Sequence, residues 1–491
     1  MKVWFILISP FLTALLCALG RSPNFIQRVS VVGSWITCFL SGFVCLHFLT
    51  HAPTTLKSSA LFIDAVGSYL AMIISVISLL VSILSKDFMN HEQKLENLKV
   101  NSYRTYYALF HVFVSTMLLV SIANNLGILW IMVEATTLST AFLVGFHRHR
   151  HSIEAAWKYV ILCSIGIAFA LFGTILFYYS AVKSGLGYSL EWTTFIEIAP
   201  QLDPRIVKLG FIFIILGYGT KAGLAPLHTW LPDAHSQAPS PISAMLSGVL
   251  LTSAFYALTR FYAITVRCVG TEIPGTILLL FGCASLGIAA PFIIAARDYK
   301  RMLAYSSIEH MGLLTFGLGI GTPFAIYGMF LHILSHAFGK SLAFLSAGRI
   351  LQTYGTRKIK KITGTITTMP ETGISFFISI LALAGLPPFS IFTSELMILS
   401  AGFASGKNWF SFLALIFLGL IFAGLLNHLV HISFGSNLQP KNDSHPLSHF
   451  SWNACAAFII VILVVLGCWM PNSLNAWLWQ MAQIIQGSSH V

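Results

Sequence analysis

The chain has 491 residues, of which 56% are hydrophobic and only 9% are charged. Soluble globular domains carry about 25% charged residues, so this composition excludes a soluble domain and predicts an all-α polytopic membrane protein. The formal net charge of +12 would suit a nucleic-acid partner, but the lysines and arginines gather in alternate loops between apolar runs. That distribution follows the positive-inside rule, so we expect a lipid bilayer around the chain and no bound nucleic acid.

Apolar runs long enough to cross a bilayer recur along the whole chain, because a spanning helix needs about 20 apolar residues. We predict about 14 such helices, at residues 3–20, 31–49, 61–85, 106–123, 124–146, 156–182, 206–227, 240–264, 274–296, 302–320, 323–350, 371–402, 409–435 and 452–470. Their even number places both termini on one side of the membrane. Because the loops rich in lysine and arginine mark the inside, both termini are predicted to lie outside.

The spacing of the cysteines and the sequences of the loops indicate whether the chain could bind a cofactor. None of the eight cysteines forms a Cys-x-x-Cys pair, so neither an iron–sulfur cluster nor a zinc ribbon is indicated. No Gly-rich phosphate loop or dinucleotide fingerprint opens a predicted helix. We therefore expect no cofactor in this chain and place any driving chemistry on a partner.

The seventh predicted helix carries a lysine close to its end. Residues 219–235 read Gly-Thr-Lys-Ala-Gly-Leu-Ala-Pro-Leu-His-Thr-Trp-Leu-Pro-Asp-Ala-His, with Lys221 inside the apolar run. A charge at bilayer depth costs roughly 3 kcal/mol or more, so it is rarely retained without a function. His228 follows at the inner end of this helix, where we expect it to connect Lys221 with the cytoplasm or to cap the loop.

A short internal repeat interrupts two predicted helices. Ala-Gly-Leu-Ala-Pro at 222–226 returns as Ala-Gly-Leu-Pro-Pro at 384–388. Glycine and proline remove helical hydrogen bonds, so we predict helix breaks at Gly223, Pro226, Gly385, Pro387 and Pro388. Interrupted helices at corresponding positions of two halves point to a transport site.

The repeat also suggests how the chain is divided. We predict four parts: N-terminal helices 1–3 at residues 1–105, an inverted repeat of helices 4–8 at 106–270, a second inverted repeat of helices 9–13 at 271–436, and helix 14 with a tail at 437–491. In this division the broken helices 7 and 12 occupy equivalent places.

Two acids and two lysines are predicted deep in the membrane: Glu134, Glu395, Lys221 and Lys340. A lone buried charge would neutralise by shifting its pKa, whereas a pair can stay charged. We therefore interpret Glu134 and Lys221 as a pair that protonation of the acid can switch. The alternative is a static ion pair that holds two helices together.

The eleventh predicted helix carries His332, His336 and Lys340 at successive spacings of four, along one helix face. Histidine titrates near neutral pH, so this row favours a proton relay. A zinc site is less favoured because no third ligand lies nearby in the sequence, and we expect no metal. Ordinary packing histidines are the other alternative. His310, placed at the start of the tenth predicted helix, could bridge the two halves.

Five segments together resemble the antiporter-like subunits of respiratory complex I, group 4 membrane-bound hydrogenases and Mrp antiporters. They are the helix around Glu134, the segment from Gly219 through Pro241, and residues 298–307, 332–345 and 385–398. The resemblance covers roughly residues 60–435. It implies that Glu134 and Lys221 form the first-half pair, that His332, His336 and Lys340 form a central relay, and that Glu395 is the exit-side group.

One departure from that family pattern narrows the resemblance. Where many complex I members have a lysine on helix 8, residues 251–254 read Leu-Thr-Ser-Ala. The step from Lys221 to the centre would then need water, Thr252 or His310. The departure suits component F of hydrogenase 4 and its relatives, which include proteins of inorganic carbon accumulation complexes.

The resemblance implies a non-catalytic, proton-translocating subunit of a larger energy-converting complex in a bacterial inner membrane. Its partners would be other membrane subunits and a peripheral, hydrogenase-like catalytic subunit. The first alternative is the membrane subunit of a proton-coupled carbon dioxide or bicarbonate uptake complex that works with a large zinc protein. The others are an Mrp-like sodium/proton antiporter subunit and a structural anchor whose buried charges are static.

Overall fold

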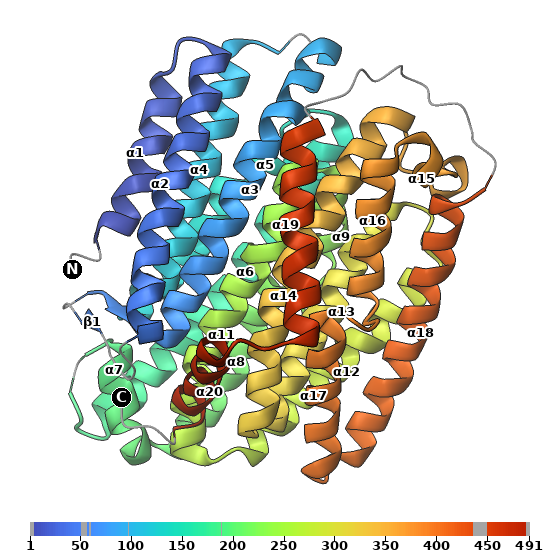
Figure 1. Ribbon diagram of the computed structural model, residues 1–491. Helices are drawn as coiled ribbons and strands as arrows, with labels where there is room; N and C mark the ends of the chain where they lie inside the picture. Colours follow the sequence, from blue (N-terminus) through green and yellow to red (C-terminus); the bar gives the residue numbers. More distant parts are fainter. Residues whose placement is uncertain are drawn as a thin grey trace.

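The computed structural model describes residues 4–50, 56–57, 60–96, 98–187, 189–435 and 449–487. Long helices lie side by side in a bundle (Figure 1). Within the described ranges the only sheet is a two-stranded antiparallel ladder of β1 (Leu56–Lys57) and β2 (Phe62–Ile63), in which Leu56 pairs with Ile63. The fold is therefore all-helical, as the composition predicts.

The first half of the chain contains α1 (Trp4–Leu19), α2 (Pro23–Thr50), α3 (Ala65–Glu96), α4 (Val100–Ile122), α5 (Leu126–Val144), α6 (Arg150–Lys183), α7 (Trp192–Ile198), η1 (Ala199–Gln201), α8 (Pro204–Ala222), α9 (Trp230–Gln237), α10 (Ser240–Met245), the π-helical turn η2 (Leu246–Leu250) and α11 (Leu251–Val269). The elements α10, η2 and α11 follow one another without a gap, so they form one long helix with a π-helical turn inside it.

The second half contains α12 (Glu272–Ile294), α13 (Tyr299–Ile320), α14 (Pro323–Tyr354), η3 (Ile359–Lys361), α15 (Thr365–Thr368), α16 (Pro370–Leu383), α17 (Ser390–Ala404), α18 (Asn408–Ser433), α19 (His449–Cys468) and α20 (Asn472–Gln486). Among the described residues, nine helical segments are long and apolar enough to cross a membrane, and three shorter apolar helices accompany them. The chain is a multi-pass integral membrane protein.

The structure interrupts the helix at both positions of the internal repeat. Helix α8 ends at Ala222, and Gly223 takes φ +81° before α9 begins. Helix α16 ends at Leu383, and Gly385 takes φ +69° before α17 begins. Glycine adopts this left-handed conformation without the steric cost of a Cβ atom. The predicted span 206–227 therefore ends as a helix at Ala222, and the predicted span 371–402 is divided into α16 and α17.

Two sequence expectations about helix ends are corrected. His310 lies in the middle of α13 and not at its start, because Asp298 caps this helix earlier by accepting from the amides of Lys300 (2.8 Å) and Arg301 (3.1 Å). The predicted C-terminal tail contains α20, a helix with both apolar and polar residues that a search for long apolar runs misses. Arg267 on α11 anchors it by donating to the carbonyl of Ile484 at 3.0 Å.

The two ends of the bundle differ in composition. At the upper end in Figure 1, the loops after α5 and α14 meet around a cavity of about 240 Å³, whose basic lining residues are His147, His149, Lys300 and Arg357. Burial, together with Lys300, lowers the pKa of His147 to about 4, so this imidazole is neutral at pH 7. Helices α7 and α20 lie at the opposite end.

Candidate functional site

The buried lysine of the first half, Lys221, is held by hydroxyl groups. It lies in the last turn of α8 with none of its surface exposed. Its Nζ donates to the Thr137 Oγ1 at 2.6 Å and to the Tyr159 hydroxyl at 2.9 Å, and it lies 4.8 Å from the centre of the Tyr159 ring. Three polar or aromatic contacts therefore replace water around a cation in an apolar bundle.

Glu134 reaches this lysine through Thr137. The two residues lie one turn apart on α5, and the Thr137 hydroxyl donates to Glu134 Oε2 at 3.2 Å. Ser164 on α6 donates to Glu134 Oε1 at 2.6 Å. Between the described side chains of Glu134 and Lys221 no direct ion pair forms. The two charges are therefore linked indirectly: the hydroxyl at position i+3 of the acid's own helix stands between them.

The second buried lysine has a similar arrangement. Lys340 on α14 is fully buried, and its Nζ donates to the Ser306 Oγ at 2.8 Å and to the carbonyl of Leu303 at 3.0 Å. The Ser306 hydroxyl in turn donates to Glu309 Oε2 at 3.3 Å. Sequence analysis placed only Glu134 and Glu395 deep in the membrane and missed Glu309, because this acid lies near the expected start of a helix.

Three histidines come together beside Lys340. His310 on α13 and His332 on α14 approach to 3.0 Å between Nδ1 and Nε2, and the rings of His310 and His336 lie 4.9 Å apart. His332 Nδ1 lies 2.9 Å from the Ser394 hydroxyl on α17, and His336 Nε2 lies 3.2 Å from the carbonyl of Ser247. The structure thus assembles residues from α13, α14, α17 and the π-helical turn η2 into one polar cluster.

Glu395 lies at the edge of this cluster, half-buried on α17. One ligand atom each of His310, His332 and Glu395 lie within 4.8 Å of one another. Two imidazoles and a carboxylate form a donor set that zinc accepts. Both ring nitrogens of His332 are already engaged in hydrogen bonds, however, so a metal would have to displace them. The hydrogen bonds present suit a proton relay better than a metal site.

Thr252 and His228, which the sequence analysis singled out, lie outside this hydrogen-bonded cluster. The Thr252 hydroxyl donates to the carbonyls of its own helix, Val249 at 2.9 Å and Gly248 at 3.4 Å. His228 is buried in the turn between α8 and α9, where its Nδ1 has no hydrogen-bond partner. Thr252 therefore forms no direct hydrogen bond that links Lys221 to the central cluster, whereas His310 is part of that cluster.

Comparison with known proteins agrees with this geometry. Residues 123–421 match the family described as NADH:quinone oxidoreductase/Mrp antiporter, transmembrane. The chain is 37% identical over 479 residues to a "Hydrogenase-4 component F homolog" of Methylacidiphilum infernorum (isolate V4), covering 96% of this chain and 97% of that protein. The chain belongs to the antiporter-like membrane subunits of complex I and Mrp type.

Solved structures show the same fold for these antiporter-like subunits. A chain of the membrane-bound sulfane sulfur reductase, an archaeal respiratory membrane complex, matches with a TM-score of 0.84 at 23% identity, over 98% of this chain and 96% of that one. A chain of the Mrp complex from Dietzia sp. DQ12-45-1b also gives 0.84, at 17% identity, over 99% of this chain and 98% of that one.

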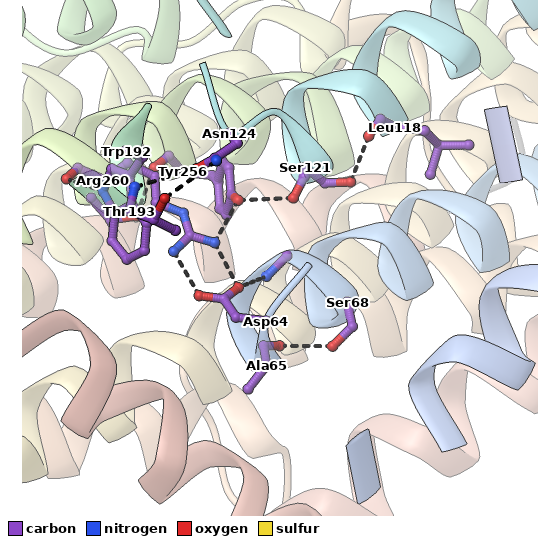
Figure 2. A network of polar contacts seen from close by, with 12 residues as sticks. Asp64, Ala65, Ser68, Leu118, Ser121, Asn124, Trp192, Thr193, Tyr256 and Arg260 are labelled. Atoms are coloured by element: carbon purple, nitrogen blue, oxygen red, sulfur yellow. Dashed lines mark hydrogen bonds and ion pairs between the residues drawn. The ribbon is translucent and has the colours of Figure 1, made fainter. Parts of the chain in front are cut away.

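This antiporter-like subunit also contains a buried ion pair that sequence analysis missed. Asp64, which directly precedes α3, accepts from Arg260 on α11 through Nη1 (2.7 Å) and Nη2 (2.6 Å). Figure 2 shows the pair surrounded by a network of further hydrogen bonds. Arg260 Nη2 also donates to the Tyr256 hydroxyl at 2.7 Å, and Tyr256 donates to the carbonyl of Ser121 at 2.8 Å.

Aromatic rings, among them that of Trp192 at the start of α7, enclose the same pair. The Arg260 guanidinium lies 4.4 Å from the centre of the Trp192 ring, and Trp192 Nε1 donates to the Arg260 carbonyl at 3.0 Å. The Trp192 amide in turn donates to the carbonyl of Asn124 at 2.6 Å. No sequence signal marked Arg260, because a single arginine in an apolar helix identifies its partner only once the helices are packed.

Proposed function

We propose that this antiporter-like subunit moves protons across a bacterial inner membrane through its buried Glu, Lys and His side chains. The observation that supports this most is the pair of similar units, Lys221–Thr137–Glu134 and Lys340–Ser306–Glu309, together with the histidine cluster that ends near Glu395. Each unit places a hydroxyl between a cation and an acid. A hydroxyl both accepts and donates, so a proton can be passed along such a unit without moving the helices.

In this proposal each unit is a switch. With the acid ionised, the lysine is stabilised as an ammonium through the bridging hydroxyl; with the acid protonated, that stabilisation is lost and the lysine can release its proton. Protons would enter from the cavity at the basic end of the bundle and leave by Glu395. Lys340 and the histidines would carry them between the two halves.

The chain would work inside a larger complex of the hydrogenase-4 or complex I type, with other membrane subunits and a peripheral catalytic subunit. Glu134 and Glu395 support this, because each is only half-buried in this chain. A carboxylate left facing lipid is costly, so neighbouring membrane subunits would cover both acids. The two ends of the route would then be the places where proton movement is coupled between subunits.

We further propose about 14 membrane crossings, with helices α4 to α11 and α12 to α18 forming two inverted repeats and both termini outside. The breaks after α8 and α16, each with a left-handed glycine, support the repeat. The basic loops that meet at one end of the bundle support the orientation, since they would face the cytoplasm.

The test is proton translocation by the assembled complex in inverted membrane vesicles, with complex yield measured in the same preparation. Glu134→Gln keeps the shape of the acid and one acceptor oxygen but removes its titration, so we expect normal yield and loss of translocation. Glu272→Gln, which changes an exposed acid at the first position of α12, is the matched control and should pump normally. Full pumping in Glu134→Gln would show that this acid carries no protons.

Mass spectrometry of the purified complex tests the partner. Hydrogenase-like subunits are expected. A large zinc protein would favour carbon dioxide or bicarbonate uptake in place of the proposed complex, and a set of small membrane subunits would favour sodium/proton exchange of the Mrp type.

A further inference from the structure

A directed chain of hydrogen bonds runs from α17 to the centre of the histidine cluster. The Ser394 hydroxyl donates to the carbonyl of Ile391 at 2.7 Å, and the same oxygen lies 2.9 Å from His332 Nδ1. On the other side of this ring, His332 Nε2 lies 3.0 Å from His310 Nδ1. Beyond it, His310 Nε2 is buried without a hydrogen-bond partner.

Counting protons along this chain fixes its direction. The Ser394 hydroxyl has a single hydrogen, and it donates that hydrogen to the Ile391 carbonyl, which can only accept. The Ser394 oxygen is therefore the acceptor toward His332, and His332 must carry a proton on Nδ1. His332 Nε2 is then the acceptor and receives the proton of His310 Nδ1–H. His310 Nε2 is left as a lone pair, which agrees with its lack of a partner.

The opposite arrangement leaves a donor unpaired. If Ser394 donated to His332 Nδ1, then His332 Nε2–H would donate to His310 Nδ1, and His310 would carry its proton on Nε2. That N–H would be fully buried with nothing to accept it, and buried unpaired donors are rare in proteins. Glu309 does not provide the missing acceptor for His310 Nε2. Its Oε1 lies 3.8 Å from Nδ1, which is the other nitrogen of the ring.

We propose that Ser394 is a positioning residue that sets the tautomers of His332 and His310, and thereby the direction in which this chain can pass a proton. This inference rests on the proposed proton route. A proton arriving at His310 Nε2 forms an N–H bond there, and the Nδ1–H bond of the same ring breaks as its proton moves to His332 Nε2. His332 then releases its Nδ1 proton toward the carboxylate of Glu395, so one proton enters and one leaves.

After the transfer both rings carry their protons on Nε2, and His310 Nε2–H has no acceptor. This arrangement is the less stable one for the reason given above. Ser394, held by the Ile391 carbonyl, therefore makes the Nδ1–H form the resting state, in which His310 Nε2 is ready to accept a proton.

The experiment measures tautomers and pumping on the same assembled complex. Solid-state NMR with ¹³C,¹⁵N-labelled histidine distinguishes Nδ1–H from Nε2–H imidazoles, and signals of His310 and His332 are assigned by their loss in His310→Gln and His332→Gln. We expect Nδ1–H at both rings in the native chain. Ser394→Ala should move both toward Nε2–H and slow translocation by about 2- to 10-fold, which is the effect of one neutral hydrogen bond. Ser394→Thr keeps the hydroxyl and should retain both properties.

Ser390→Ala is the matched control, because it removes a buried hydroxyl one turn earlier on α17 that accepts from Ser335 at 2.7 Å and contacts no histidine. It should leave the tautomers of His310 and His332 unchanged. Unchanged tautomers in Ser394→Ala would overturn the proposal. Shifted tautomers with undiminished pumping would instead keep Ser394 as the positioning residue and show that protons do not pass through these histidines.

Discussion

The buried cations Lys221, Lys340 and Arg260 differ in their partners. Lys221 and Lys340 contact hydroxyl groups that stand between them and an acid. Arg260 instead forms a bidentate ion pair with Asp64 directly. A guanidinium does not deprotonate in proteins, so the arginine pair is a fixed element, whereas an ammonium shifts its pKa readily when buried. In the proposed proton route the lysines therefore carry protons, and the arginine has a structural role.

The Asp64–Arg260 pair yields a stability prediction. Arg260→Met leaves the Asp64 carboxylate buried without its partner, so we expect a loss of about 3–5 kcal/mol in unfolding free energy. The double variant Asp64→Asn with Arg260→Met removes both charges and should be less destabilised than Arg260→Met alone. Thermal unfolding of the purified protein in detergent measures the difference.

The exposed pair of Lys183 with Asp203, 2.9 Å apart, provides the control. Lys183→Met should change stability by less than about 1 kcal/mol, because solvent screens a surface pair. Equal losses in Lys183→Met and Arg260→Met would contradict the structural role given to Asp64 and Arg260.

At the scale of the elements, interruptions of regular helix coincide with the polar cluster. The π-helical turn η2 leaves the carbonyl of Ser247 to accept from His336, and π-helical turns often occur at functional sites. The break between α16 and α17 brings Gly385 against the carboxyl group of Glu395. Each interruption removes a backbone hydrogen bond from the helix and places a polar group next to a proposed proton carrier.

This contact leads to a prediction for Gly385→Ala. A Cβ atom at this position would lie 2.9 Å from Glu395 Cδ, so the carboxyl group must move. We expect translocation by the assembled complex to fall at least as far as in Glu395→Gln. Gly406→Ala is the matched control, since Gly406 also has a positive φ of +77° but open space around its Cβ position. The Gly406→Ala control should lose about 1–2 kcal/mol of stability from the left-handed backbone alone and keep its transport rate. If Gly385→Ala and Gly406→Ala pump equally, crowding at Glu395 has no functional effect.

At the scale of the whole molecule, basic residues gather at one end of the bundle, whereas α7 and α20 lie at the other end, beside a cavity of about 300 Å³ that residues of α20 line. The cavity at the basic end lies against Lys300, whose Nζ donates at 2.8 Å to the carbonyl of Ala238, three residues after His235. Toward that other end, side chains of Asp64 (just before α3), Trp192 on α7 and Arg260 on α11 are joined by hydrogen bonds.

Reporter fusions test the orientation. A fluorescent protein fused after Lys358 should fluoresce, and alkaline phosphatase at the same point should be inactive, because the basic run around it is expected in the cytoplasm. Fusions after Gly185, in the loop before α7, should give the reverse result. Active phosphatase after Lys358 would invert the proposed topology and with it the direction of the proton route.

The sequence by itself determined the membrane class, the approximate positions of the long helices and the breaks after Ala222 and Leu383. These features depend on composition and on local chemistry: runs of about 20 apolar residues form spanning helices, and glycine with proline ends them. The same local reasoning singled out Glu134, Lys221, Lys340 and the histidines as unusual, since polar groups stand out in an apolar run.

Only the tertiary structure decided which of these groups meet. Thr137, Ser306 and Ser394 are ordinary residues in a membrane helix, and each becomes significant because a partner from another helix lies within hydrogen-bond distance. Asp64 and Arg260 are separated by almost two hundred residues and meet only when the bundle brings the segment before α3 to α11. Hydrogen bonds between distant helices depend on packing geometry, which periodicity and composition along one chain do not contain.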